Sequence, residues 1–149
     1  MAELYDMREE EERVILVAVS TGDGDDTEES VDELAELVKT AGAVAADRII
    51  QNRERCIREP TWEREKIEEV RERVLALQAT GVVCDDELSP AQLRNLEDAL
   101  QTKVMDRTMV ILDIFASHAV TREGKIQVEL AQLRYRAIRL VGMRNSLSR

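Results

Sequence analysis

The 149-residue chain has few aromatic side chains, which make up 3% of it, although apolar residues make up 44%. Its core must therefore be built from Val, Ile, Leu and Ala. These residues typically fill the space between helices and a parallel sheet. The length fits one compact domain with one appendage.

Cysteine and histidine are also scarce. Cys56 and Cys84 stand 28 residues apart without a CxxC pair, and His118 is the only histidine, so no zinc framework can be drawn. We expect both cysteines to be reduced thiols, with Cys84 packed as an apolar residue in a strand. We expect His118 to cap a helix end or lie on the surface, because no Ser or Cys nucleophile pairs with it by any spacing rule.

Only six glycines are present, and none forms the GxxxxGK[ST] loop that cradles phosphates in nucleotide hydrolases. Gly124-Lys125 lacks the upstream glycine and is followed by Ile126. Gly22-x-Gly24 has no third glycine and is surrounded by aspartates, which would repel a pyrophosphate. We therefore expect no P-loop catalysis and no cofactor in this chain.

Long apolar runs are missing too. None approaches the roughly 18 residues of a membrane span, and the acidic N-terminus is unlike a signal peptide. We expect a cytoplasmic protein without a membrane partner.

Apolar patterning predicts four strands that alternate with helices. The apolar run 14–19 lacks alternation and indicates a strand covered on both faces. The other predicted strands are Val44–Asn52, placed at an edge or an end, Val82–Cys84 and Lys103–Arg107. Helical spacing marks 31–38, 67–77 (ended by Gly81), 93–100 and the mostly buried 109–116. The fold class is thus α/β, a three-layer sandwich on a four-stranded mainly parallel sheet.

The sharpest local signal is Ser89-Pro90-Ala91-Gln92. Ser at the cap, Pro at the first helical position and Gln at the third predict a capping box. At the start of the first predicted helix, either Asp26 or Thr27 can serve as the cap.

Carboxylates follow two of the predicted strands. Asp23, Asp25 and Asp26 come after the first, and Asp85, Asp86 and Glu87 after the third. Both groups would meet at the carboxyl edge of a parallel sheet, where hard oxygen ligands could hold Mg²⁺. One alternative is therefore a Mg²⁺-dependent enzyme that uses Asp25, Asp26 and Asp85. The other is that these residues are helix caps and solubilising charge.

The C-terminal part, residues 120–149, differs from the predicted 1–119 α/β domain. One long helix there carries an apolar stripe with 4-3-4-3 spacing, formed by Ile126, Leu130, Leu133, Ala137 and Leu140. Such a stripe must dock on the α/β domain, pair with a second copy or await a missing segment. A homodimer through the 126–141 helix is one of these alternatives.

Charge is also distributed unevenly. Residues 122–149 hold seven basic and two acidic residues, a net charge of +5, whereas the rest of the chain holds 14 basic and 29 acidic residues, a net charge of −15. Such polarity can mark a phosphate-rich partner. The alternative is a solvated helix with more Arg than Glu.

Trp62, in a charged loop around Pro60, could stack on a base or anchor in the core.

Three stretches resemble the N-terminal part of HflX-type ribosome-associated GTPases. They are 85–96 (DDELSPAQLRNL), 104–108 (VMDRT) leading into 111–116 (ILDIFA), and 121–136 (TREGKIQVELAQLRYR). With the first strand and helix, the resemblance covers nearly the whole chain.

The resemblance implies a non-catalytic N-terminal domain of a cytoplasmic GTP-binding protein that acts in stress response. The full-length family binds GTP and Mg²⁺ in a GTPase domain absent from this chain. It binds the large ribosomal subunit and splits or rescues stalled ribosomes. The long helix would begin a hairpin whose loop, from about Gly142, reaches ribosomal RNA. The expected RNA-binding residues are Arg139, Arg144, Asn145, Ser146 and Arg149.

Two departures from the family pattern have structural consequences. Glu63 and Glu65 replace a glycine-bearing turn, which argues against an accessory nucleotide site there. Ala137-Ile138 replaces the usual Leu-Pro, so we expect the long helix to continue without a kink.

Overall fold

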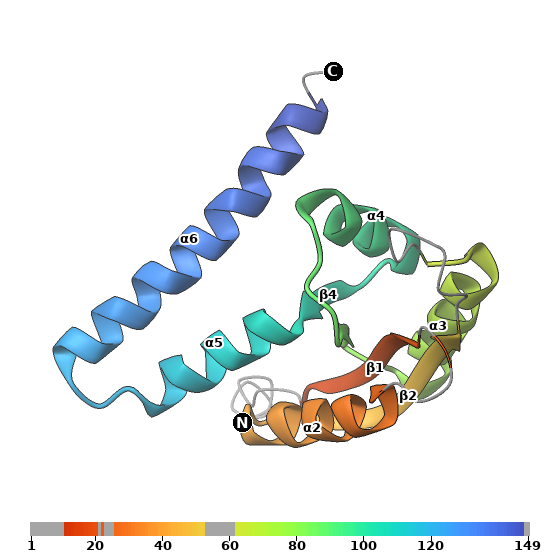
Figure 1. Cartoon of the computed structure of the whole chain (residues 1–149), viewed down its shortest axis with the longest axis horizontal. Coiled ribbons are helices and arrows are strands. Elements are labelled where there is room, and N and C mark those ends of the chain that lie inside the picture. The colour runs from red at the N-terminus through yellow and green to blue at the C-terminus, as the bar shows by residue number, and fades with distance from the viewer. Residues whose placement is uncertain (1–10, 21, 23–25, 53–61, 148–149) are drawn as a thin grey trace, which may run out of the picture.

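A computed structural model describes residues 11–20, 22, 26–52 and 62–147, and for residue 136 and residues 138–147 it describes the backbone alone. The elements follow in the order β1 (Arg13–Ser20), α2 (Thr27–Thr40), β2 (Val44–Asn52), α3 (Arg64–Leu77), β3 (Gly81–Cys84), α4 (Pro90–Leu100), β4 (Lys103–Asp106), α5 (Arg107–His118) and α6 (Arg122–Leu147). We call residues 11–118 the body (Figure 1).

The four described strands form one parallel sheet in the order β2-β1-β3-β4. β1 and β3 occupy the centre, which explains their uninterrupted apolar sequences. β2 lies at one edge, as its polar residues predict, and its pairing with β1 shifts register between Val14 and Ile15. β4 forms the other edge.

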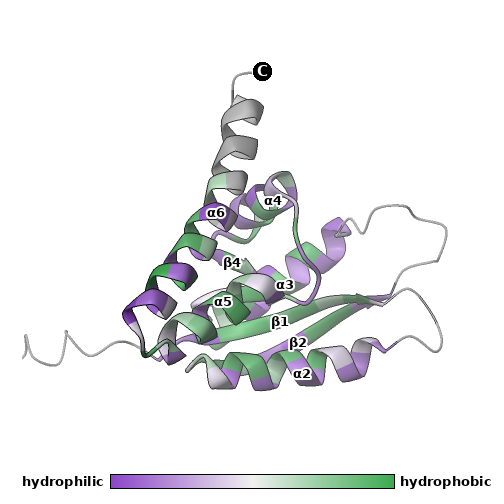
Figure 2. Cartoon of the chain, turned by 60° about the vertical axis from the view of Figure 1, so that its left-hand side comes forward, coloured by the Kyte–Doolittle hydropathy of each residue, from purple (hydrophilic) through white to green (hydrophobic). Residues whose placement is uncertain are grey.

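Side chains of β1 alternate between two apolar clusters, one on each face of the sheet. Ile15 and Val17 belong to the cluster under α3 and α4, and Val14 and Leu16 to the cluster under α2 and α5. The predicted three-layer α/β sandwich is confirmed, and Figure 2 shows the apolar β1 above α2, with β2 beside it. Trp62 is partly buried against the first cluster and is thus a core anchor.

The predicted capping box of α4 is present. The Ser89 hydroxyl accepts from the Gln92 amide (3.2 Å), and the Gln92 side chain accepts from the Ser89 amide (3.0 Å). At α2 the cap position belongs to Asp26, whose side chain makes no capping hydrogen bond.

Three predicted details of the body are wrong. α3 ends at Leu77, with Gln78 as a left-handed cap, and Gly81 is instead the first residue of β3. A Cβ at Gly81 would lie 3.3 Å from the Lys103 carbonyl oxygen, so this glycine permits close strand approach. Arg107 begins α5 rather than ending β4, because Asp106 caps the helix. Finally, α5 is less buried than predicted, with Phe115 57% exposed.

α6 is a single helix from Arg122 to Leu147 and continues through Ala137-Ile138, as the missing proline predicts (Figure 1). The expectation that a loop starts at Gly142 is wrong, because residues 142–147 are helical. One interior glycine costs about 1 kcal/mol relative to alanine, which a long helix tolerates.

Among the described residues, no helix combines the length and apolar character that a membrane crossing requires.

Candidate binding helix and its attachment to the body

α6 leaves the body as a long arm and packs against α4 and α5 (Figure 1). The face turned toward the body holds the partly buried residues of its first half, which are Gly124, Val128, Ala131, Gln132 and Tyr135. Their spacing of four, three, one and three residues places them on one side of a helix. This face has few large apolar side chains, so it lacks the means to form a continuous apolar seam.

The predicted apolar stripe lies on the opposite side of α6. Ile126, Leu130 and Leu133 are exposed, with Leu133 61% accessible. They are offset by two residues from Gly124, Val128 and Ala131, which is about 200° around a helix. Figure 2 shows apolar and polar bands interleaved along this half of α6. These three residues of the stripe therefore do not dock on the body, which leaves a second copy or a missing segment as alternatives for covering them.

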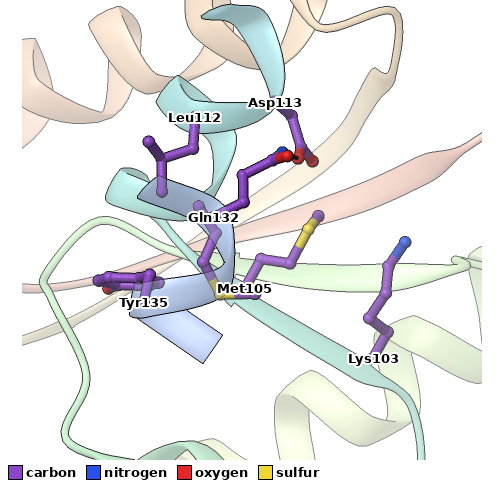
Figure 3. A pocket seen from close by; sticks show the side chains of 7 residues that line it. Lys103, Met105, Leu112, Asp113, Gln132 and Tyr135 are labelled. Atoms are coloured by element: carbon purple, nitrogen blue, oxygen red, sulfur yellow. Dashed lines mark hydrogen bonds between the residues drawn. The ribbon is translucent and has the colours of Figure 1, made fainter. Parts of the chain in front are cut away.

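A small cavity of about 140 Å³ separates α6 from the edge strand β4 and from α5 (Figure 3). It is lined by Lys103, Met105, Met109, Leu112, Asp113, Gln132 and Tyr135. The Gln132 amide nitrogen donates to the Asp113 carboxylate across one side of it (3.0 Å). The cavity is thus formed jointly by side chains of α6, β4 and α5.

A stronger attachment joins α6 to the end of β4. The Tyr135 hydroxyl donates to Asp106 Oδ2. Asp106 is 0% exposed and also accepts from the backbone amides of Leu88 (3.2 Å) and Met109 (3.0 Å). One buried carboxylate thus receives donors from α6, from the segment before α4 and from the first turn of α5. Each of these donors offsets the cost of burying its charge.

Next to Asp106, an ion-pair network runs along the carboxyl edge of the sheet. The Arg107 guanidinium donates to Asp85 Oδ1 from Nε (3.0 Å) and from Nη2 (2.7 Å). Ser30 donates to Asp85 Oδ2 (2.6 Å), and Arg107 also reaches the Ser30 carbonyl (2.8 Å) and Glu33 (3.4 Å). This network ties α2 to β3 and to the start of α5.

Burial and local negative charge alter two neighbouring groups. Burial, and next the charge of Asp85, raise the pKa of the Asp86 carboxyl, while Arg107 opposes the shift. Burial also raises the pKa of the Cys84 thiol, with the charge of Asp106 as the next cause. Cys84 is buried and free of disulfide bonds. It is therefore a neutral packing residue, as predicted.

The residues at this edge do not fit the alternative of a magnesium site. The Asp85 carboxylate is directed at Arg107 and Ser30, and a guanidinium beside it repels a divalent cation. Asp26 stands at the start of α2, and Asp23 and Asp25 fall outside the described residues. Within the described ranges no three His, Cys, Asp or Glu side chains cluster so as to hold a metal ion. His118 ends α5 on the surface, as predicted.

The predicted RNA-binding residues fall at the far end of α6. The backbone at Arg139, Arg144, Asn145 and Ser146 is helical, while Arg149 lies outside the described residues, as does Cys56. Helical backbone at Asn145 and Ser146 means that they extend the arm instead of forming a loop. The roles of all five residues stay predictions.

Sequence reasoning missed Asp106, Arg107 and Tyr135. A signal was available for Asp106, because an acidic residue between a strand and an apolar helical run is a preferred cap. Nothing in the local pattern indicated that Tyr135, 29 residues later, would reach it.

Two family models match consecutive parts of the chain. The model described as "GTP-binding GTPase N-terminal" matches residues 28–116, and "GTP-binding GTPase Middle Region" matches residues 118–149. GTPase HflX of Lacrimispora saccharolytica is 72% identical over all 149 residues. GTPase HflX of Escherichia coli strain K12 is 42% identical over 138 residues, or 93% of the chain. The chain spans 35% and 32% of the length of these relatives.

Solved structures share the fold. A GTP-binding protein from the archaeon Sulfolobus solfataricus in complex with GDP matches with a TM-score of 0.65 and 21% identity, over 89% of this chain and 40% of that one. The G235S variant of a protein described as SsGBP matches with a TM-score of 0.68 and 21% identity, over 88% of this chain and 42% of that one. This chain belongs to the HflX family of GTPases and corresponds to the N-terminal part of those proteins.

Proposed function

We propose that this chain is a non-catalytic, ribosome-binding part of an HflX-type protein, and that α6 is the arm that meets ribosomal RNA on the large subunit. The observation that carries the proposal is the polarity of α6. Its first half holds the arm to an acidic body, and its second half brings the net positive charge of residues 122–149 away from that body (Figure 1). Family membership supplies the class of partner.

Charge then determines how the chain can meet RNA. With a net charge of −10, the whole molecule is repelled by phosphate at long range. A basic segment at the end of an arm reduces this repulsion by placing the positive charge ahead of the acidic body. Arg contacts with phosphate then supply affinity that falls steeply with salt.

The test is co-sedimentation of the chain with purified large ribosomal subunits over a series of salt concentrations. A triple variant, Arg139→Glu, Arg144→Glu and Arg149→Glu, should lose binding. In the unaltered chain, we expect the slope of log K against log salt to correspond to about two or three phosphate contacts.

The matched control carries the same change of charge on the body. Lys39, Arg64 and Arg71 are exposed positions on α2 and α3, and their reversal to Glu changes the total charge equally. The control should keep most of its binding. If both triple variants lost binding equally, net charge alone would account for it, and the assignment of the arm would be wrong.

The exposed stripe favours a second candidate function, self-association. Ile126, Leu130 and Leu133 form an apolar surface with the spacing of a two-helix seam. Sedimentation velocity between micromolar and submillimolar concentration distinguishes the two candidates. A dimer that Leu130→Glu with Leu133→Glu converts to monomer, but that Gln127→Glu leaves intact, would establish the seam. A monomer at all concentrations would remove this candidate.

A further inference from the structure

Asp106 is a buried carboxylate on which three elements converge. It accepts from Leu88 before α4, from Met109 in α5 and from Tyr135 in α6. Two of these donors are backbone amides fixed within the body. The third is one side chain of the arm. Asp106 therefore links the arm to two body segments at the carboxyl edge of the sheet.

Another polar contact of α6 with the body lies at the surface. The Gln132–Asp113 hydrogen bond is exposed to solvent, and exposed polar contacts contribute little to stability. Beside it lies the cavity between α6, β4 and α5, which Met105, Met109 and Leu112 line (Figure 3). The apolar stripe faces away from the body. The Tyr135–Asp106 hydrogen bond is charge-assisted and partly buried, and it is the polar contact of α6 that reaches a fully buried group of the body.

We propose that Asp106 couples the direction of α6 to the position of the 85–89 segment. A shift of this segment moves the Leu88 amide, which alters the position of Asp106 and so releases or re-aims Tyr135. Arg107 extends the same connection to α2, because it follows Asp106 directly and binds Asp85 and Ser30. Movement at the carboxyl edge is thereby transmitted to the arm, and coupling of this kind is reciprocal, since each end must bias the other equally.

Tyr135→Phe is the direct test in the complete chain, because it removes one hydroxyl and keeps the ring. We expect hydrogen exchange at amides of residues 128–135 to become about tenfold faster, as loss of a charge-assisted hydrogen bond implies. The distinguishing readout is the Leu88 amide. Coupling predicts that its exchange also becomes faster, although Leu88 lies 47 positions earlier in the chain. A hydroxyl that serves only α6 would leave Leu88 unchanged.

Two further variants complete the test. Gln132→Ala, the matched control on the same face of α6, should change exchange in α6 less than about twofold and leave Leu88 unaffected. Asp106→Asn keeps the size of the side chain and an oxygen that can cap α5. It should release both α6 and Leu88 while far-UV circular dichroism shows the fold intact.

The single tryptophan offers a geometric readout. Energy transfer from Trp62, which is anchored in the body, to a label on Glu129→Cys in a Cys56→Ser background measures the spread of arm directions. The proposal predicts a broader distance distribution for the Tyr135→Phe variant than for the chain with Tyr135 intact. Faster exchange in α6 with an unchanged Leu88 amide would overturn the coupling. Unchanged exchange and an unchanged distance distribution would overturn the role of the hydroxyl itself.

Discussion

The body and the arm use their apolar residues in opposite ways. In the body, the apolar side chains of β1 and β3 enter two clusters, one on each face of the sheet, and helices cover both clusters. In α6, Ile126, Leu130 and Leu133 are exposed, while the smaller Val128 and Ala131 are partly buried where the helix packs against α4 and α5. The large apolar clusters that stabilise the fold therefore lie in the body, whereas the arm combines a smaller packed face with the polar contacts Gln132–Asp113 and Tyr135–Asp106 to the body.

This difference has a mechanical consequence. Burial of apolar area is non-directional and scales with area, so it fixes a compact shape without fixing the angle of a protruding element. A hydrogen bond has a narrow geometry, and breaking it leaves the helix itself intact. The arm can thus change direction at small cost to the fold, which is compatible with the binding role that we propose for it.

The largest expected effect comes from opening a cavity in the body. Leu16 is buried in the middle of β1 between two other strands. Leu16→Ala should lower the free energy of unfolding by about 2–5 kcal/mol, because it removes buried methyl groups and leaves a void. Urea unfolding followed by far-UV circular dichroism and Trp62 fluorescence measures this. A loss below about 1 kcal/mol would contradict the view that these clusters carry the stability.

Removal of the guanidinium at the carboxyl edge should have the next largest effect. Arg107→Met keeps an apolar stem but leaves Asp85 with Ser30 as its partner. We expect a loss of about 1–3 kcal/mol in the free energy of unfolding, because a largely buried charge loses its counter-ion. Arg71→Met on the exposed face of α3 is the control and should change stability by less than about 0.5 kcal/mol. Equal effects of the two variants would show that the network is dispensable.

Much of the body followed from the sequence, because its signals are local. The run 14–19 and the spacing of Leu93, Leu96 and Leu100 depend on burial alone, and both predictions are confirmed. The end of α3 was misplaced because Gln78 adopts a left-handed conformation that usually marks glycine. At this position the amides of Gln78 and Ala79 donate to the carbonyls of Leu75 and Val74, and these hydrogen bonds close the helix without a glycine.

The attachment of the arm could not be predicted, because it depends on contacts between distant residues. Heptad spacing located the stripe on α6 but could not show which way it faces. The partners Tyr135 and Asp106, and likewise Arg107 and Asp85, come together only once strand order and helix direction are fixed. For the same reason the aspartates after β3 looked like metal ligands, since their cationic neighbour comes from another part of the chain.

A loss of intermediate size should follow from removing the cap of α4, against which α6 packs. Ser89→Ala deletes the acceptor for the Gln92 amide and should lower the free energy of unfolding by about 1 kcal/mol. Because the change removes a cap of α4 and none of the described polar contacts of α6, hydrogen exchange in α6 should follow global unfolding only. Selective loosening of α6 in this variant would mean that body and arm are less independent than their contacts indicate.

The smallest effect is expected from a substitution on the outer face of the arm. It tests the contrast with the body most directly. Leu133→Ala removes as many carbon atoms as Leu16→Ala, but its side chain is 61% accessible rather than buried. In dilute solution the free energy of unfolding should change by less than about 0.5 kcal/mol, because surface substitutions away from packed features are nearly neutral. Measurement over a range of protein concentrations separates the possible roles of the stripe. A loss of more than about 1 kcal/mol that appears only at high concentration would show that the stripe is covered by a second copy. The same loss at every concentration would mean that Leu133 packs on the body, and the contrast between body and arm would then be wrong.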